Sequence, residues 1–333
     1  MSFTASSVAL APLSIPSPPT SWQIPISIPI WNGMVINIHM YALCIVVGII
    51  AATLLTEYRL RKRGVEPWAV IDILIWVVPL GIIGARAWHV ATHPADFFPV
   101  DGQVHDGVTY DWLHVIAIWD GGGAIMGSVL FGALGVFLGC RISGIRFTTA
   151  VDAIAPGLLI AQALGRFGNY FNHEIFGTPT NLPWGLEIES TNAAFPAGLA
   201  DGTLFQPTFL YEMLWNIVGA VLLIVIDRKL HLQWGRIFAL YLVWYGLGRA
   251  WLEPMRLDPS EIYFGLRVNE WGAILLIVVG IVLFIVQSVR HPGAEPSAYR
   301  PGREWRRPSA EVDSELVYSD EDDAPLPAGA HRG

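Results

Sequence analysis

Seven apolar stretches, each long enough to cross a lipid bilayer, constrain the fold of this chain more than any other feature. A helix needs about 20 apolar residues to span roughly 30 Å of hydrocarbon. The 333 residues are 53% hydrophobic and only 14% charged, whereas about a quarter of the residues in a soluble chain are charged. The sequence predicts an all-α polytopic membrane protein with about seven transmembrane helices, near 33–56, 68–91, 115–140, 148–171, 207–227, 236–256 and 269–289.

The distribution of Lys and Arg predicts how these helices are oriented. Cytoplasmic loops of membrane proteins are enriched in both residues, and alternate segments of this chain hold 15 of them against one. The N-terminus is therefore expected outside and the C-terminus in the cytoplasm. The basic segments are 57–67, 141–147, 228–236 and the tail from residue 290, and the others are 1–32, 92–114, 172–206 and 257–268.

Three regions are predicted along the chain. Residues 1–32 contain no Lys or Arg, so they lack the basic region of a signal peptide and are interpreted as an extracytoplasmic arm. Residues 33–290 form the seven-helix membrane domain, and its outer loops 92–114 and 172–206 are expected to form a small head. Residues 291–333 are Pro-rich and acidic and are predicted to be a disordered cytoplasmic tail.

Several common kinds of site have no counterpart in the sequence. Cys44 and Cys140 both lie in apolar runs, which argues against a disulfide framework or a Cys-based metal site. The chain also lacks HExxH, EF-hand, P-loop and GxSxG patterns. No metal, cofactor or nucleic acid is therefore expected.

The densest polar group in the predicted helices is the segment 165–177, which reads GRFGNYFNHEIFG. Ionisable groups inside a membrane are costly, so they are functional candidates by default. The alternative is a Gly-mediated helix contact with an arginine that reaches the membrane surface. Helical periodicity places four polar positions near one face of this predicted helix: Gln162, Arg166, Asn169 or Tyr170, and His173.

A second polar stripe runs along the predicted helix 236–256. Its members recur at helical spacing, and two arginines on separate helices, Arg166 and Arg249, would suit an anionic phosphate, whose oxygens match a planar guanidinium. A purely structural Arg–Glu pair is the alternative. The stripe consists of Tyr245, Arg249, Glu253 and Arg256.

Four weaker polar groups lie at the ends of predicted helices. A lone His or Tyr in such a position is more often an interfacial anchor than a catalyst, and a run of glycines is also compatible with a simple kink. The groups are Asn37, His39 and Tyr41; Arg86 and His89; Asp120 with Gly121–Gly123; and Gln206–Glu212.

Residues 165–177 resemble the signature of the prolipoprotein diacylglyceryl transferases, G-R-x-G-N-x-x-N-x-E-x-x-G, at every fixed position. Shorter motifs are similar to that family in order and spacing across roughly residues 35–290. They comprise His39 with Tyr41, Gly84 with Arg86, Trp119–Gly122, Asp152–Pro156, Pro207–Glu212, and Tyr245 with Arg249 and Glu253.

The resemblance implies transfer of the diacylglyceryl group of phosphatidylglycerol to the lipobox cysteine of a prolipoprotein signal peptide, with release of glycerol phosphate, in the bacterial cytoplasmic membrane. Both substrates would then reach the enzyme through the lipid bilayer. The expected catalytic residues are Arg166, Arg249, Glu253, Tyr41 and His39, and the expected substrate-binding residues are Arg166, Asn169, Glu174, Gly177, Arg86 and Tyr245.

One position departs from the family pattern. Many relatives have a histidine where this chain has Met126, and a thioether cannot act as a general base, so the sequence leaves the proton acceptor open. Two other classes of function are compatible with intramembrane charges. A secondary transporter or channel would use them as a pathway, although no internal repeat favours this, and a non-catalytic membrane scaffold would leave the polar stripes unexplained.

Overall fold

The computed structural model describes residues 14–19, 23–28, 34–98, 113–116, 123–257 and 260–305. Within these residues, six helices are long and apolar enough to cross a membrane, and α8 is shorter, at 17 residues. The prediction of an all-α polytopic membrane protein is confirmed. The long helices are α1 Met40–Lys62, α2 Ala69–Thr92, α5 Ile125–Ser143, α6 Phe147–Phe171, α7 Thr208–Leu230, α8 Arg236–Leu252 and α9 Val268–Arg290.

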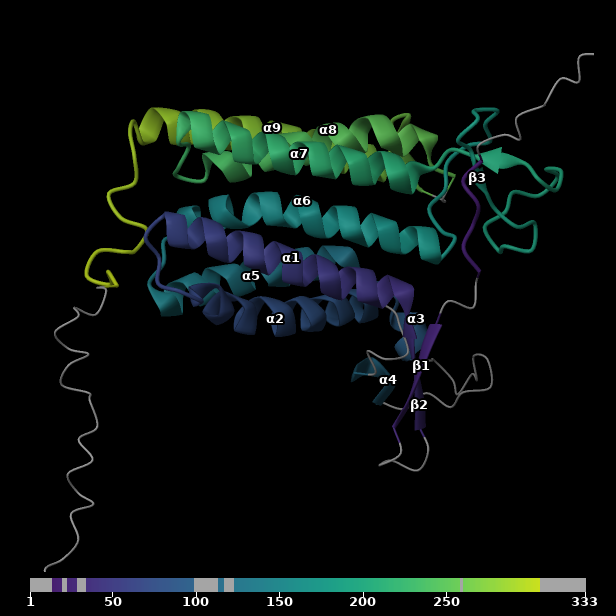
Figure 1. The fold of residues 1–333 in the computed structure, drawn as a ribbon, viewed down its shortest axis with the longest axis horizontal. Helices are drawn as coiled ribbons and strands as arrows, with labels where there is room; N and C mark the ends of the chain where they lie inside the picture. The colour runs from purple at the N-terminus through teal and green to yellow at the C-terminus, as the bar shows by residue number, and fades with distance from the viewer. Residues whose placement is uncertain are drawn as a thin grey trace, which may run out of the picture.

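The long helices run side by side in three layers (Figure 1). Helices α7, α8 and α9 form one layer, α1 and α6 lie in the middle, and α2 packs with α5 on the other side. In the most apolar 18-residue stretch of α6, 56% is buried inside the protein, whereas 11% of the corresponding stretch of α9 is buried. Helix α6 is therefore the central element, and most of α9 is left to face lipid.

Helices α2 and α5 are joined by a row of glycines, which we call the glycine seam. A Cβ on Gly127 would lie 2.0 Å from the carbonyl oxygen of Gly84, so the two backbones touch. Farther along, a Cβ on Gly135 or Gly139 would lie 2.7 Å from the Cα of Val77 or Ile73. Small residues are what allow membrane helices to approach so closely.

Several helix boundaries differ from the predictions, and three of them have a clear cause or limit. The first helix begins at Met40 because residues 34–39 form strand β2, whose apolar residues cannot be told from a helix start by hydropathy alone. The third begins at Ile125, and 117–122 lie outside the described residues. Helix α8 ends at Leu252, two residues before Pro254, which has no N–H to donate and disfavours helical geometry in the residue before it.

Short elements connect the long helices. Strand β1 Gln23–Ile28 pairs antiparallel with β2 Met34–His39, and the other antiparallel pairs are β3 Leu186–Glu187 with β4 Leu204–Phe205 and β5 Ile262–Tyr263 with β6 Leu266–Arg267. The remaining short helices are α3 Pro94–Phe97, α4 Leu113–Ile116 and the 3₁₀ helix η2 Glu253–Met255.

Residues 172–206 have a core of their own, to which the N-terminal part of the chain contributes. Ile15 donates its N–H to the carbonyl of Gly185 and accepts from the N–H of Glu187, at 2.8 and 2.9 Å. This contact fixes residues 14–19 against the unit. The core is made of Phe176, Leu186, Ile188, Phe205 and Phe209.

Residues 291–305 pack against the opposite end of the bundle, which differs from the prediction of disorder from residue 291 onward. Tyr299 is 3% exposed, pairs with Ile145 in an antiparallel bridge, and accepts a hydrogen bond from the N–H of Glu66 at 3.0 Å. Composition and periodicity missed this segment because a few long-range contacts, rather than a repeating pattern, hold it. The rest of the predicted tail, 306–333, lies outside the described residues.

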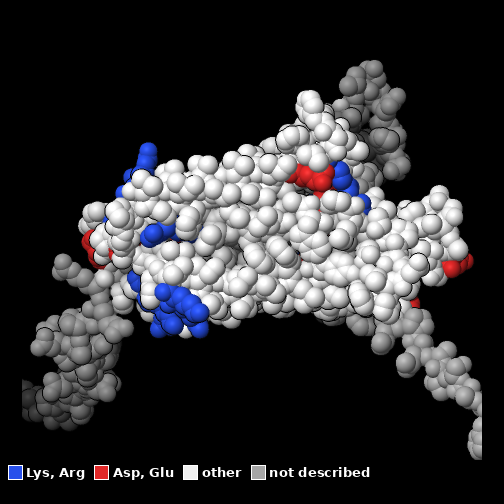
Figure 2. Space-filling model, turned by 90° about the horizontal axis from the view of Figure 1, so that it is seen from above, with Lys and Arg blue, Asp and Glu red and all other residues white. Residues whose placement is uncertain are grey.

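Charged side chains lie mainly near the two ends of the helix bundle. On the face seen in Figure 2, Lys, Arg, Asp and Glu gather toward the two ends and leave a wide uncharged band between them. The last turns of α1 and α7 carry five Lys or Arg at one end: Arg59, Arg61, Lys62, Arg228 and Lys229. Such a band between charged ends is what a bilayer requires of a protein surface.

Candidate functional site

The side chain of Glu212 brings together three arginines from different parts of the chain. Glu212 lies one turn into α7 and is 5% exposed. Its Oε2 is 2.5 Å from Nε of Arg166 on α6, and its Oε1 is 3.9 Å from Arg249 on α8 and 3.7 Å from Arg256, just after η2. The arginines of the two polar stripes predicted from sequence therefore meet at one buried carboxylate.

A second buried carboxylate, Glu253, holds the other side of this cluster. It is fully buried and lies 2.7 Å from Nη2 of Arg249, one helical turn earlier in the chain. Arg267 of β6 approaches the same carboxylate at 3.5 Å, and the Asn269 amide donates to it at 2.8 Å. Arg249 thus spans two carboxylates that belong to two different helices.

Arginines outnumber the two central carboxylates of this cluster. The four arginines around Glu212 and Glu253 exceed these two carboxylates by two charges. Oε1 of Glu212 faces Arg249 and Arg256 only at longer range and accepts no hydrogen bond from the described residues. A buried carboxylate oxygen without a hydrogen bond is unusual, so the attraction between Oε1 of Glu212 and these two guanidinium groups is electrostatic.

A line of hydrogen bonds continues from Arg166 along the end of α6. Arg166 donates to Oδ1 of Asn169 at 3.4 Å, and the Asn169 amide donates to Glu174 at 2.7 Å. Glu174 lies between two non-glycine residues with positive φ, His173 at 51° and Ile175 at 58°. Residues of this kind seldom adopt left-handed backbone, and such strain is concentrated at functional sites. The turn after α6 therefore holds Glu174 against Asn169.

Gly177 is required at a crowded crossing of three segments. A Cβ at this position would lie 2.7 Å from Cβ of Gln206 and 2.9 Å from the carbonyl oxygen of Met255. Gly177 also forms an antiparallel bridge with Arg256. The glycine that ends the signature thus ties the turn after α6 to the end of α8, and so helps to place Arg256 beside Glu212.

Tyr41 and Tyr245, the aromatic residues predicted for the site, pack near α6. The ring of Tyr41 packs against Gly168, where a Cβ would come within 2.7 Å of it. Tyr245 stacks on Tyr241 at 6.1 Å, and the Tyr241 hydroxyl accepts from the Gln162 amide at 2.9 Å.

Arg86, His39 and Met126 lie on α2, before α1 and on α5, not on the helices that supply the arginine cluster. Arg86 donates to the carbonyl of Val115 at 2.9 Å and lies over the ring of Phe97. His39 is the exposed residue before α1, and Met126 is 57% exposed in the first turn of α5. The predicted groups Trp119–Gly122 and Asp120 lie outside the described residues.

Sequence reasoning missed part of this cluster. Glu212 was grouped among weak helix-end signals, Arg267 was counted only as a loop charge, and Asn269 was not singled out. Arg267 is the one basic residue of the segment 257–268, and that isolation is the signal that points to it. Within the described residues, no three His, Cys, Asp or Glu side chains gather as a metal site.

Comparison with known proteins links this arrangement to one family. The family model described as prolipoprotein diacylglyceryl transferase matches residues 29–286. The phosphatidylglycerol–prolipoprotein diacylglyceryl transferase of Leifsonia xyli subsp. xyli is 51% identical over 317 residues, which cover 93% of each chain. Proteins of the same name from Bifidobacterium adolescentis and Cutibacterium acnes are 42% and 39% identical, over 75% and 91% of this chain and 75% and 96% of their own length.

Proposed function

Because this chain belongs to the prolipoprotein diacylglyceryl transferase family, we propose that it transfers the diacylglyceryl group of phosphatidylglycerol to the lipobox cysteine of a prolipoprotein signal peptide. The carbon–oxygen bond between the glycerol carbon and the phosphate oxygen breaks, and a carbon–sulfur bond forms at that carbon. The products are a thioether on the protein and glycerol phosphate, which leaves with the bridging oxygen.

The observation that carries this proposal is the meeting of Arg166, Arg249 and Arg256 at Glu212. The reaction has an anionic nucleophile and an anionic leaving group, so it needs fixed positive charge at both. Guanidinium groups held in place by buried carboxylates need no rearrangement as charge develops, which is how preorganised groups lower a barrier. Nearby cations also lower the pKa of a cysteine and so favour the thiolate.

Each of the other signature residues has a supporting role in this scheme. Asn169 presents its amide between Arg166 and Glu174. Glu253 orients Arg249 and Arg267. Gly177 fixes the crossing described above. Tyr41 and His39 lie at the start of α1 and assist substrate binding there, while Arg86 and Tyr245 bind substrate from α2 and α8.

The proton of the cysteine thiol goes to a group other than Met126, whose sulfur is no base. Glu174 is our candidate acceptor, because it lies at the end of the hydrogen-bonded line from Arg166 and is held there by the strained turn. Its hydrogen bonds from Asn169 and Asn172 come from amides, which do not neutralise the carboxylate. No metal is needed in this scheme.

We further propose that the chain spans the bacterial cytoplasmic membrane with the arginine cluster toward the outer side. The end of the bundle opposite the cluster holds the basic last turns of α1 and α7 and the basic residue Arg290 of α9. Positive charge of this kind favours the cytoplasm. The unit formed by 172–206 would then lie outside, and 291–305 inside.

The direct test uses purified protein in phosphatidylglycerol vesicles with a fluorescent lipobox peptide. We expect thioether formation on the peptide cysteine, detected as a mass increase that resists hydroxylamine, and equimolar glycerol phosphate. A matched peptide with serine in place of the cysteine should give neither product. Ion flux or solute uptake without lipidated peptide would instead support a transporter and refute the proposal.

A further inference from the structure

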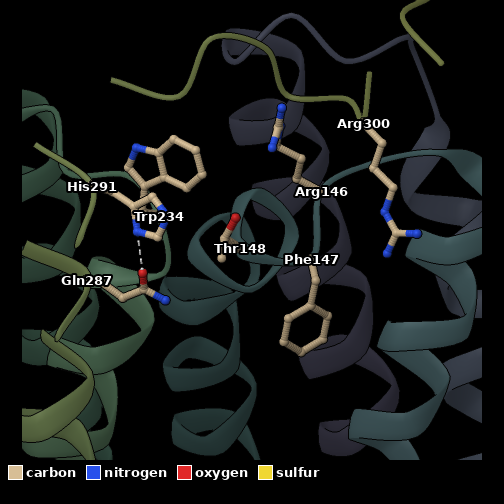
Figure 3. A pocket seen from close by; sticks show the side chains of 7 residues that line it. All are labelled: Arg146, Phe147, Thr148, Trp234, Gln287, His291 and Arg300. Carbon is tan, nitrogen blue, oxygen red and sulfur yellow. Dashed lines mark hydrogen bonds between the residues drawn. The ribbon is translucent and has the colours of Figure 1, made fainter. Parts of the chain in front are cut away.

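A shallow, open recess of about 280 Å³ lies at the end of the bundle opposite the arginine cluster, and the proposed reaction gives it no role. Its walls come from the start of α6, the last turn of α9, the connection before α8 and the packed segment 291–305. Figure 3 shows the side chains that line it. Four separate segments of the chain therefore meet around one recess.

The lining offers hydrogen-bond donors and positive charge. The guanidinium of Arg146 lies over the Trp234 ring, 5.6 Å from its centroid. Its Nε donates a hydrogen bond to the carbonyl of Ser297, so this bond does not use the two terminal nitrogens. Arg300 is held by its backbone N–H, which donates to the carbonyl of Gly144. Neither guanidinium has an ion pair with a carboxylate among the described residues.

Two further polar residues, Gln287 and His291, complete the polar side of the pocket. His291 stacks on Trp234 with ring centroids 4.2 Å apart, and its Nδ1 shares a hydrogen bond of 2.8 Å with Oε1 of Gln287. This bond occupies the acceptor oxygen of Gln287 and leaves its amide nitrogen as a donor. Two arginines and an amide thus line one recess, and guanidinium and amide N–H groups are donors that suit the oxygens of a phosphate.

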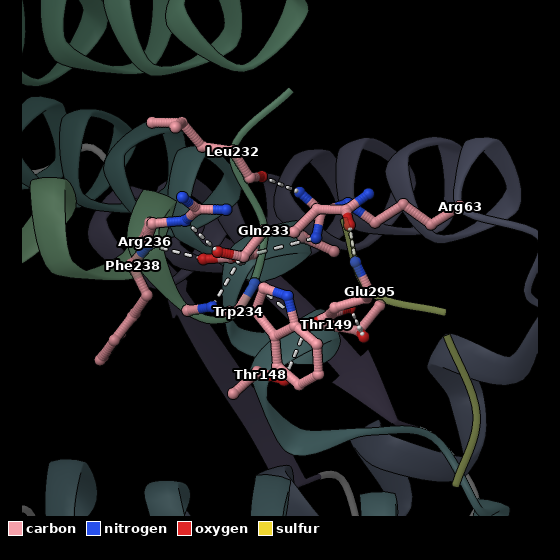
Figure 4. A network of polar contacts seen from close by, with 12 residues as sticks. Arg63, Thr148, Thr149, Leu232, Gln233, Trp234, Arg236, Phe238 and Glu295 are labelled. Atoms are coloured by element: carbon pink, nitrogen blue, oxygen red, sulfur yellow. Dashed lines mark hydrogen bonds and ion pairs between the residues drawn. The ribbon is translucent and has the colours of Figure 1, made fainter. Parts of the chain in front are cut away.

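Glu295 belongs to the same packed segment as Arg300, and the hydrogen bonds that it accepts come from residues other than the two arginines. It accepts from the hydroxyls of Thr148 and Thr149 and from the N–H of Trp234 (Figure 4). These bonds fix the connection before α8 to the first turn of α6. Glu295 therefore builds the wall of the pocket and leaves Arg146 and Arg300 unneutralised.

The apolar side of the pocket favours a lipid over a soluble phosphate. Phe147 lines the recess, is 37% exposed, and packs edge-on against Phe137 of α5 at 6.2 Å. Phe137 is itself 46% exposed and lies well inside the span of α5. An apolar surface thus runs from the recess toward the uncharged band of the protein, as an acyl chain below a headgroup requires.

We propose that this pocket binds the phosphate of an anionic phospholipid in the leaflet opposite the arginine cluster, with Arg146 and Arg300 on the phosphate and Phe147 beside an acyl chain. Basic recesses at the cytoplasmic ends of membrane helices bind anionic headgroups in this way. The site is separate from the transfer reaction and takes no part in it.

The test uses the full chain in phosphatidylcholine vesicles that contain a photoactivatable phosphatidic acid, with labelled peptides identified by mass spectrometry. We expect labelling of peptides from the start of α6 and the end of α9. In Arg300→Gln this labelling should fall about tenfold, because the loss of one charge-assisted contact commonly weakens binding by that factor. Labelling near Arg166 is the internal reference and should not change.

Arg303→Gln is the matched control, since it removes the same charge from the same segment at an exposed position that does not line the pocket. Wild-type labelling in Arg303→Gln supports the proposal. If wild type and Arg300→Gln, both shown to be folded by thermal melting, are labelled equally, the proposal is wrong. That is the result to expect if another part of the chain fills the recess. Displacement of the label by inorganic phosphate alone would overturn the assignment to a lipid.

Discussion

Replacing Arg249 by lysine keeps the charge but removes the fork that joins two helices. In the structure, the two terminal nitrogens of Arg249 lie 2.7 Å from Glu253 and 3.9 Å from Glu212. A lysine has one ammonium group and can serve only one of these carboxylates. We expect Arg249→Lys to lower the rate of transfer by about 10²–10³, equivalent to roughly 3–4 kcal/mol, which is the usual effect of losing a donor that acts on developing negative charge.

The same substitution also has a cost in stability, which must be separated from the effect on rate. One hydrogen bond to a charged group is worth about 1.5–3 kcal/mol when buried. Arg59→Lys is the matched control: Arg59 is somewhat more buried than Arg249, lies 3.0 Å from Asp227 and donates to the carbonyls of Asp152 and Ala153 at the other end of the bundle. It should lose comparable stability without loss of turnover.

The assay is the initial rate of peptide lipidation per folded enzyme in vesicles, with the folded fraction taken from thermal melting. Arg249→Lys within a few-fold of wild type would show that charge alone is sufficient. A loss of rate in Arg59→Lys equal to that in Arg249→Lys would show that the effect arises from general destabilisation. Either result would refute the role given to the guanidinium fork.

Three further outcomes are expected. Gly177→Ala should lose most activity and about 1–3 kcal/mol of stability, since its Cβ would clash with Gln206; initial rates and melting of the purified variant measure both. Met126→His should change the lipidation rate only slightly, because Met126 is exposed and the proton acceptor lies elsewhere; a large gain in rate would contradict this. Protein treated with EDTA should keep its turnover, and loss of activity that a divalent cation restores would refute the metal-free scheme.

The sequence predicts the long helices well because their apolar lengths are set by the bilayer. Helix α2 was expected at 68–91 and is found at 69–92, and α9 was expected at 269–289 and is found at 268–290. Hydropathy was insufficient where an apolar segment is not helical, as in β2. It was also insufficient for the segment around Tyr299, since one buried ring and a few backbone bonds leave no periodic trace.

The arginines of the candidate site could be predicted from the sequence, but the carboxylate that they share could not. Periodicity placed Arg166 on one helix and Arg249 with Glu253 on another, and the structure brings these residues together. The element that unites them, Glu212, is a single carboxylate on a third helix, and only packing shows that its oxygens face both arginines. Arg267 joins from the hairpin before α9, and its isolation as the one basic residue of 257–268 is the only sequence signal that points to it.

The glycine seam between α2 and α5 determines where this protein cannot open toward the bilayer. Where the two backbones are in van der Waals contact, as at Gly84 and Gly127, no acyl chain can pass without pulling the helices apart over several turns. The pair must therefore behave as one wall that moves as a unit. A diacyl lipid that reaches the arginine cluster sideways, and a lipidated product that leaves it, have to cross the boundary between other helices of the bundle.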